Sequence, residues 1–241
     1  MINLSVNLNK VALLRNSRNF GIPSVIKAAF TCIQAGAHGI TVHPRPDERH
    51  IKPEDVYELA KIQNVEFNIE GNPSPKFLEI IRDVKPTQCT LVPDAPEAFT
   101  SDHGWDLVTN EFWLRPIIQE LKELGIRVSL FLEPDLTQIE RAKEIGADRI
   151  ELYTEPYATA FRKGDVESVF QQYQQAAKKA EEIGLGVNAG HDLNLQNLGK
   201  FCLIPNILEV SIGHALIADA LDMGLFNAVN EYLNILAIIN Y

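Results

Sequence analysis

The chain has 241 residues, of which 46% are hydrophobic and 22% are charged, with 14 glycines and 13 prolines. This composition is typical of a globular protein and excludes disordered and collagen-like chains, and no apolar run is long enough for a membrane span. The net charge of −10 argues against nucleic acid as a partner, because nucleic-acid-binding proteins present basic surfaces.

The first fifty residues differ in charge from the rest of the chain. They carry six basic and two acidic side chains, a net charge of +4, so the remaining 191 residues carry −14. Such a concentration of positive charge suits the binding of a small anion, although clustering on a solvated face gives the same pattern. The N-terminus lacks the features of a secretory signal, and the three cysteines lack metal-type spacing. We therefore expect a cytoplasmic protein in which Cys32 and Cys89 are small buried side chains.

A recurring phrase organises the chain: a helical stretch, a glycine, and a short apolar run that ends in polar residues. It reads QAGAHGITVH at 34–43, ELGIRVSLFLE at 123–133, EIGADRIELYT at 144–154 and EIGLGVNAGH at 182–191. The glycine suits the left-handed residue that ends a helix, and the run after it is typical of a buried strand. Four copies predict βα units and a parallel sheet.

The remaining units follow the same alternation along the chain. Eight strands in 241 residues match a (β/α)8 barrel of about 250 residues, so we expect an α/β, single-domain TIM barrel over residues 1–241 with extra short helices. A doubly wound open sheet is the alternative, but no G-x-G-x-x-G follows the first strand. The predicted strands are 2–8, 39–43, 65–70, 88–92, 126–132, 148–153, 185–190 and 207–212, and the predicted helices are about 24–36, 53–63, 74–84, 110–124, 136–145, 165–183, 194–201 and 215–239.

Two connections are longer than is usual between a strand and the next helix. Residues 9–22 contain the apolar and basic segment KVALLRNSR, which is suited to a short extra helix. Residues 93–109 are rich in proline, aspartate and small side chains. Long loops on a compact domain often close over a site, so the second connection is a candidate lid.

Polar side chains gather at the predicted carboxyl ends of the strands, where barrels of this type place their chemistry. An inward-facing carboxylate there has to be paired or has a raised pKa, which makes Glu70 and Glu151 the strongest candidates for function. For any single histidine at a strand end, a structural role is the commoner alternative. The polar residues at the strand ends are Asn7, Asn9, Lys10, His43, Arg45, His50, Asn68, Glu70, Glu133, Glu151, Thr154, Asn188, His191 and His214.

The last two strands each end in a glycine followed by a histidine and a helix. Gly190 and Gly213 allow close approach of the backbone to a ligand, and helix N-termini present unpaired N–H groups. Phosphate sites recur at this place in such barrels. We therefore expect a phosphate site there.

Metal and Schiff-base chemistry are the alternatives for this site. A divalent ion could in principle be bound by His43, His50, Glu70 and His191. No H-E-x-x-H motif is present, however, so we expect no metal. Of the twelve lysines only Lys10 lies at a strand end, which disfavours a Schiff-base lysine. The residues predict acid/base chemistry on a phosphorylated small molecule, with no bound cofactor.

Segments along essentially the whole chain resemble the pyridoxine 5'-phosphate synthase family. The resemblance implies a barrel with extra helices that condenses 3-amino-2-oxopropyl phosphate with 1-deoxy-D-xylulose 5-phosphate, giving pyridoxine 5'-phosphate, phosphate and water. It also implies a homo-octamer. The segments are VNLNKVALLRNSR (6–18), AGAHGITVHPRPDERHI (35–51), NIEGN around Glu70, LVPDAPEAFTSDHGWD (91–106), VSLFLEPD (128–135), VNAGHDLN (187–194) and SIGHALI (211–217).

The resemblance implies a role for each site residue. His43 and Glu70 would be proton acceptors, and His191 a proton donor. Glu151 would stabilise a charged transition state. The residues that would hold the aminoketone phosphate are Asn7, Arg18, Asp192, Gly213 and His214, and those that would hold the deoxyxylulose phosphate are Arg45, His50 and Thr100, with Asn9 and Lys10 contributing.

The chain departs from the family's commoner pattern in three places. Asn9 and Lys10 stand where an Asp-His pair is usual, Asp192 stands where glycine is usual, and Glu155 also replaces a commoner glycine. A carboxylate beside a phosphate is unfavourable unless it points away. Two other functions fit the same residues: a phosphosugar isomerase or epimerase on this barrel, and a non-catalytic phosphometabolite-binding protein.

Overall fold

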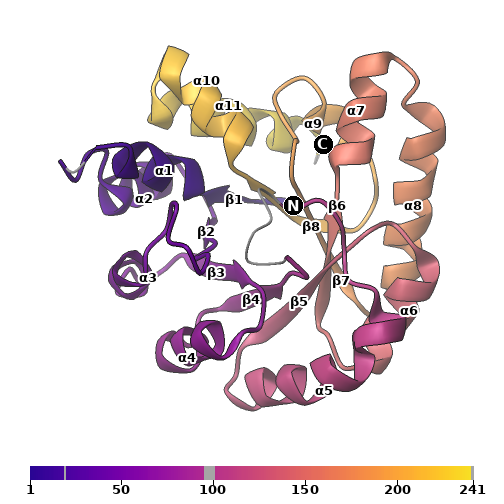
Figure 1. Ribbon diagram of the computed structural model, residues 1–241. Coiled ribbons are helices and arrows are strands. Elements are labelled where there is room, and N and C mark those ends of the chain that lie inside the picture. The colour runs from indigo at the N-terminus through magenta and orange to yellow at the C-terminus, as the bar shows by residue number, and fades with distance from the viewer. Residues whose placement is uncertain (19, 95–100, 240–241) are drawn as a thin grey trace.

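The computed structural model describes residues 1–18, 20–94 and 101–239, and its centre is a closed barrel of eight parallel strands (Figure 1). Each strand pairs with the next, and β8 pairs with β1. The predicted (β/α)8 fold is confirmed, and each strand lies within one residue of its predicted bounds. The strands are β1 (Asn3–Asn7), β2 (Gly39–Val42), β3 (Glu66–Gly71), β4 (Gln88–Leu91), β5 (Arg127–Leu132), β6 (Arg149–Tyr153), β7 (Gly186–Gly190) and β8 (Ile207–Ile212).

Helices surround the barrel and cover the outer face of the sheet (Figure 1). Pro53 and Pro75 occupy the first turns of α3 and α4, where a missing N–H costs nothing, as the sequence predicts. The helices are α1 (Asn9–Asn16), α2 (Val25–Gln34), α3 (Pro53–Leu59), α4 (Pro75–Val84), α5 (Leu107–Glu123), α6 (Leu136–Glu144), α7 (Glu155–Lys163), α8 (Glu167–Glu182), α9 (Leu198–Phe201), α10 (His214–Met223) and α11 (Leu225–Ile239).

Five helical segments differ from the prediction by three residues or more. Helix α3 ends four residues before its predicted end, and α9 begins four residues after its predicted start. The connection after β6 was expected as a loop but contains α7, which begins with Pro156 in its first turn and ends at Gly164 in the left-handed region. The last predicted helix is divided into α10 and α11, because Gly224 has φ 82° and ψ 146° and breaks the helix. Helix α5 starts three residues early because the Asp106 carboxylate accepts a hydrogen bond from the Val108 N–H and caps it.

The two faces of the sheet bury different kinds of side chain. On β1, Leu4 and Val6 are fully buried within the hydrophobic core, whereas Ser5 between them hydrogen-bonds to Thr41 across the barrel interior at 2.7 Å. The Thr90 hydroxyl donates to Asn68 Oδ1 at 3.0 Å in the same interior. This alternation follows from the two-residue period of a strand. The apolar core therefore lies between sheet and helices, and the barrel interior is a hydrogen-bonded polar layer.

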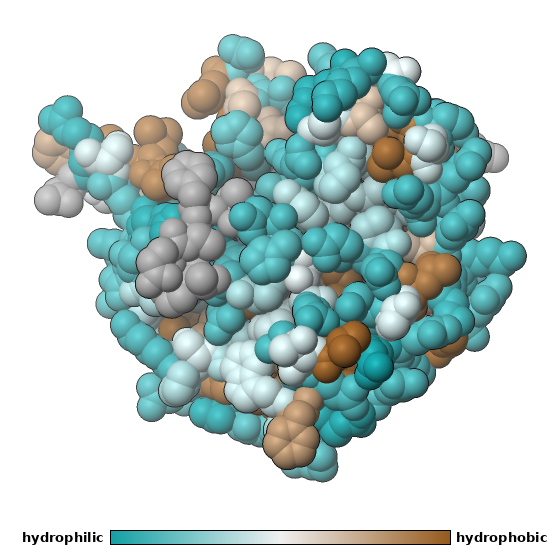
Figure 2. All heavy atoms as spheres, turned by 45° about the vertical axis from the view of Figure 1, so that its right-hand side comes forward, coloured by the Kyte–Doolittle hydropathy of each residue, from teal (hydrophilic) through white to brown (hydrophobic). Residues whose placement is uncertain are grey.

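The surface is mainly hydrophilic on the face shown in Figure 2, and the cysteines are buried. The apolar side chains on this face lie in separate spots. Among the described residues no helix combines the length and the apolar character needed to cross a membrane. Cys32 and Cys89 are completely buried, as predicted, and Cys202 is buried as well.

Candidate active site

A cavity of about 440 Å³ opens where the strands end, which is the rim that the sequence predicts for the site. Its volume lies within the range of small-molecule pockets. It collects side chains from all eight βα units, so residues from position 7 to position 215 share one space. The predicted site residues that line it are Asn7, Asn9, Lys10, His43, Arg45, His50, Glu70, Glu151, His191, Asp192, Gly213 and His214.

Two predicted site residues are not among the residues that line this cavity. Arg18 lies two residues beyond the end of α1, is exposed, and has its guanidinium 5.0 Å from the centre of the Phe20 ring. The structure therefore does not bring Arg18 together with the other predicted residues. Thr100 lies outside the described residues.

The cavity floor holds two titratable groups whose pKa values move in opposite senses. Burial lowers the pKa of His43 well below its ordinary value, and the neighbouring positive charge of Arg45 lowers it further. Burial raises the pKa of Glu70 well above its ordinary value, and the negative charge of Glu151 adds to this effect. His43 is therefore a neutral imidazole at neutral pH and can accept a proton, and burial favours the protonated form of the Glu70 carboxyl, which can donate one.

Glu151 is the second buried carboxyl of the cavity. Burial, and then the charge of Glu209, raise the pKa of Glu151 to about 8. A Cβ atom at Gly190 would lie 2.8 Å from Glu151 Oε1, so only glycine there leaves room for this carboxyl. Within the described part of the chain Glu151 Oε2 is buried and has no hydrogen-bond partner. This unsatisfied oxygen lies in the cavity wall, where a ligand group can bind it.

The end of β1 and the start of α1 hold the acid/base groups in place. Asn9 Oδ1 accepts a hydrogen bond from the backbone N–H of His43 at 2.9 Å. Asn7 Oδ1 accepts from the backbone N–H of Asn9 at 3.0 Å, and Asn7 Nδ2 donates to Glu70 Oε2 at 3.4 Å. Helix α1, which the sequence predicts as a short extra helix, therefore begins at the site and fixes the position of His43.

The loop after β2 brings cationic and imidazole groups to the cavity, and α1 braces it. Asn16 Nδ2 donates to the backbone carbonyls of Glu48, Arg49 and His50 at 2.8–3.2 Å. His50 Nδ1 accepts a hydrogen bond from the Ile51 N–H at 2.9 Å, which leaves the ring proton on Nε2. Burial lowers the pKa of His50 to about 4, and nearby positive charges add to the effect, so this ring is a neutral donor.

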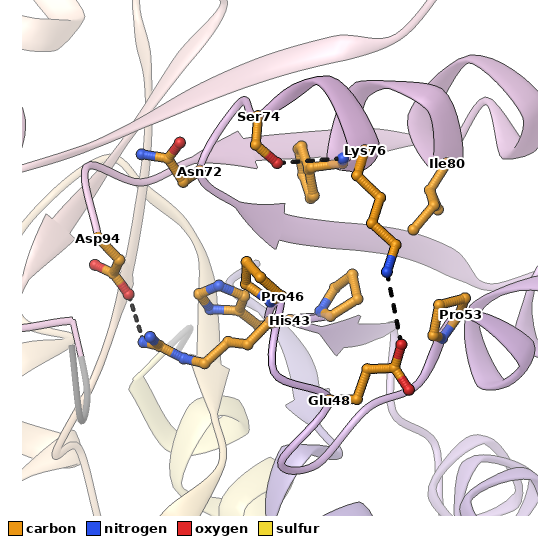
Figure 3. A pocket seen from close by; sticks show the side chains of 12 residues that line it. His43, Pro46, Glu48, Pro53, Asn72, Ser74, Lys76, Ile80 and Asp94 are labelled. Carbon is orange, nitrogen blue, oxygen red and sulfur yellow. Dashed lines mark hydrogen bonds and ion pairs between the residues drawn. The ribbon is translucent and has the colours of Figure 1, made fainter. Parts of the chain in front are cut away.

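Arg45 is buried and is held by the start of the loop after β4. Its guanidinium pairs with Asp94 at 2.5 Å, and the Ser101 hydroxyl donates to the same Asp94 oxygen at 2.6 Å. Arg45 lines both the main cavity and a smaller one of about 70 Å³, and Asp94 lines the smaller one. In the smaller cavity Lys76 reaches toward Glu48 at 3.7 Å, beside proline and other apolar side chains (Figure 3). Arg45 and Asp94 thus join two loops across the wall of the site.

The first turn of α10, which follows β8, is a candidate anion site at the cavity. Gly213, His214 and Ala215 line the cavity, and the N–H groups of a first helical turn lack intrahelical partners. These groups and the helix dipole favour a bound anion. A Cβ atom at Gly213 would lie 3.1 Å from Asn7 Cβ, so a larger residue would crowd the floor of this site.

Several lining residues were missed from the sequence. Phe131 and Val92 form an apolar wall with Tyr153, and Ser211 lines the cavity from β8. Each lies at a strand end or within one residue of it, so the period-two alternation of the strands is the available signal. Asp94 and Ser101 carried no comparable signal, because their positions depend on how the loop folds back.

Comparison with protein families identifies the chain. A family model described as "Pyridoxal phosphate biosynthesis protein PdxJ" matches residues 4–238. The chain belongs to this family. It is 54% identical over 237 residues to "Pyridoxine 5'-phosphate synthase" of Bacteroides fragilis (strain YCH46), covering 98% of this chain and all of that one. It is 51% identical over 239 residues to the protein of the same name from Porphyromonas gingivalis, covering 99% of this chain and all of that one.

Solved structures with low sequence identity share the fold. "Native KDPGal structure" has a TM-score of 0.64 at 11% identity and covers 98% of this chain and 95% of its own. Thiamine phosphate pyrophosphorylase from Pyrococcus furiosus has a TM-score of 0.61 at 12% identity, with 99% and 96% covered. At these identities the likeness concerns the barrel alone.

Of the positions that depart from the pattern expected of the family, Asn9, Lys10 and Asp192 line the cavity, whereas Glu155 begins α7 and is not among the lining residues. Asn9 uses its amide oxygen on the His43 backbone, a role that requires no acid. Lys10 lines the cavity and is one of the positive charges that lower the pKa of His50. Asp192 also lines the cavity, and its carboxylate contacts the ring of His191.

Proposed function

We propose that the chain is a pyridoxine 5'-phosphate synthase. It condenses 3-amino-2-oxopropyl phosphate with 1-deoxy-D-xylulose 5-phosphate and releases phosphate and water. Its membership of the family and the name of its relatives support this activity. The single observation that carries it to this chain is that His43, Glu70 and His191 meet in one cavity that also contains an anion site.

The protonation states of the two floor groups suit the sequence of proton transfers. Schiff-base formation, enolisation, phosphate loss, water addition and ring closure each move a proton next to a carbonyl or imine, and a placed acid or base accelerates such a step about 10²–10⁴-fold. His43 is neutral and accepts a proton directly. The raised pKa of Glu70 favours its protonated form, so in this proposal it can donate a proton in one step and accept one in another. Glu151 keeps the role that the resemblance implies, which is to stabilise a charged transition state.

Two phosphate groups bind at separate places in the cavity in this proposal. The aminoketone phosphate binds at the first turn of α10, through Gly213 and His214, with Asn7 close by. The deoxyxylulose phosphate binds on the cationic side, through Arg45 and His50. Arg18 and Thr100 keep their predicted roles as phosphate and substrate ligands within this proposal.

The assembly and location of the protein complete the proposal. We infer one domain over residues 1–241, a homo-octamer and a cytoplasmic location, with no metal and no cofactor. Exposed apolar side chains on α10 and α11 support self-association: Leu221 is 76% exposed and Phe226 47%. Light scattering coupled to size-exclusion chromatography measures the assembly, and a monomeric mass would contradict it.

The experiment supplies each substrate alone and then both together. Pyridoxine 5'-phosphate is followed by fluorescence, and inorganic phosphate by a colorimetric assay. Both products should form only from the mixture, in equal amounts. Turnover of a single phosphate compound would instead indicate an isomerase or epimerase, and binding without phosphate release would indicate a non-catalytic binding protein.

A further inference from the structure

The loop after β7 turns sharply at His191 and Asp192, the first two residues after the strand. Both residues lie in the left-handed region, with φ of 73° and 59°, although neither is glycine. Neighbouring segments hold this backbone: the Thr154 hydroxyl donates to the His191 carbonyl, and Asn197 Nδ2 donates to the Asp192 carbonyl at 3.0 Å. A strained conformation persists only where the surroundings fix it, and such residues cluster at functional sites.

The turn brings the two side chains together at the cavity. Asp192 Oδ2 lies 3.0 Å from His191 Nδ1, and both side chains are partly buried in the cavity wall. The Tyr153 ring meets the His191 ring edge to face, with 5.2 Å between centroids. Because an ionised carboxylate only accepts hydrogen bonds, Nδ1 carries the proton of this contact.

The carboxylate of Asp192 is committed to this contact. Its pKa is lowered, first of all by the hydrogen bond from His191 and also by the charges of Arg162 and His214. An ionised carboxylate repels a phosphate, so the side chain of Asp192 is unsuited to holding one. Its observed partner is an imidazole.

We propose that Asp192 is a positioning residue that orients His191 for proton transfer, and this inference rests on the proposed function. Asp192 keeps the Nδ1 proton in place while the proton on Nε2 moves to the substrate oxygen and the ring becomes neutral. The same logic operates where a carboxylate orients a catalytic imidazole in other enzymes. A side chain assigned by resemblance to substrate binding thus acts on a neighbouring residue.

The test compares Asp192→Gly with Asp192→Asn. Glycine adopts the left-handed backbone without strain and removes only the carboxylate, so this variant should fold. It should lower kcat about 10–100-fold, the effect of losing a hydrogen bond to a charged group, with little change in KM. Asparagine retains an oxygen that accepts from Nδ1 and should lower kcat less.

Lys85→Gly is the matched control. Lys85 is exposed, has φ 48° in the C-cap of α4, and does not line the cavity, so the kcat of this variant should equal that of the parent.

Nitrogen NMR of the histidine ring gives a readout that does not require turnover. In the neutral ring of the parent and of Asp192→Asn, the His191 proton should reside on Nδ1, whereas Asp192→Gly should show both tautomers. Unchanged kcat and an unchanged tautomer in Asp192→Gly would overturn the inference. A raised KM with parental kcat would also overturn it, in favour of a substrate-binding role. If the parent makes no product, the proposed function fails, and the tautomer alone decides whether Asp192 orients His191.

Discussion

The buried carboxyl of Glu151 predicts an unusual pH dependence of stability. Its pKa in the folded protein is about 8, against an ordinary value of 4.5, because burial and the charge of Glu209 disfavour the ionised form. Glu151→Gln replaces it by a neutral side chain of the same size, which resembles the protonated carboxyl. The substitution removes the titration while leaving the packing at Gly190 in place.

The sign and the size of the effect follow from linkage. The raised pKa stabilises the fold fully below pH 4.5, and this contribution is lost as the pH rises toward about 8, because the unfolded chain ionises first. The difference between the two pKa values, at ~1.36 kcal/mol per pH unit, corresponds to at most about 5 kcal/mol. The Gln variant should therefore match the parent near pH 4.5 and exceed its unfolding free energy by several kcal/mol near pH 8.

Urea unfolding at a series of pH values between 4.5 and 8.5 measures this difference. Glu182→Gln, on the exposed face of α8, is the matched control and should follow the parent at every pH. A Gln variant whose stability ran parallel to the parent's across the whole range would refute the reasoning, because it would mean that Glu151 is ionised in the folded protein at neutral pH.

Further predictions concern the rate, the loop and the charge network. Glu70→Gln and His191→Asn should each lower kcat by about 10²-fold or more, and near-normal turnover in both would contradict the acid/base assignment. Gly104→Ala should raise KM in steady-state kinetics. The new Cβ would lie 2.6 Å from the backbone at the end of β5 and would displace the loop after β4. An unaltered KM would show that this loop does not act on substrate binding. Glu209→Gln should lower the pKa of Glu151 below about 8, measured by infrared titration of the carboxyl, and no change would contradict the coupling.

The fold was predictable because its signals are local. Gly36, Gly125, Gly146 and Gly184 each follow a helix with φ between 73° and 102°, so the recurring glycine marks a backbone conformation that other residues seldom adopt. The apolar runs after these glycines are strands of the barrel. Helix α7 also has local signals, because a proline lies in its first turn and a glycine caps its end.

The site was predictable only in part. Strand ends meet at one rim of a barrel, and this geometry alone brings His43, Glu70 and Glu151 into one cavity. Contacts between loops do not follow from periodicity. The pairing of Arg45 with Asp94 depends on how a loop folds back over the barrel, and Arg18 lies two residues beyond the end of α1.

A crystal structure with one substrate and an unreactive analogue of the other tests the central claim most directly. We predict two phosphate groups in the cavity of about 440 Å³, one at the N–H groups of Gly213 and His214 and the other beside Arg45 and His50, with the carbon skeletons between Glu70 and His191. Ligands bound at separate places on the surface, or a cavity that admits only one phosphate compound, would contradict the account.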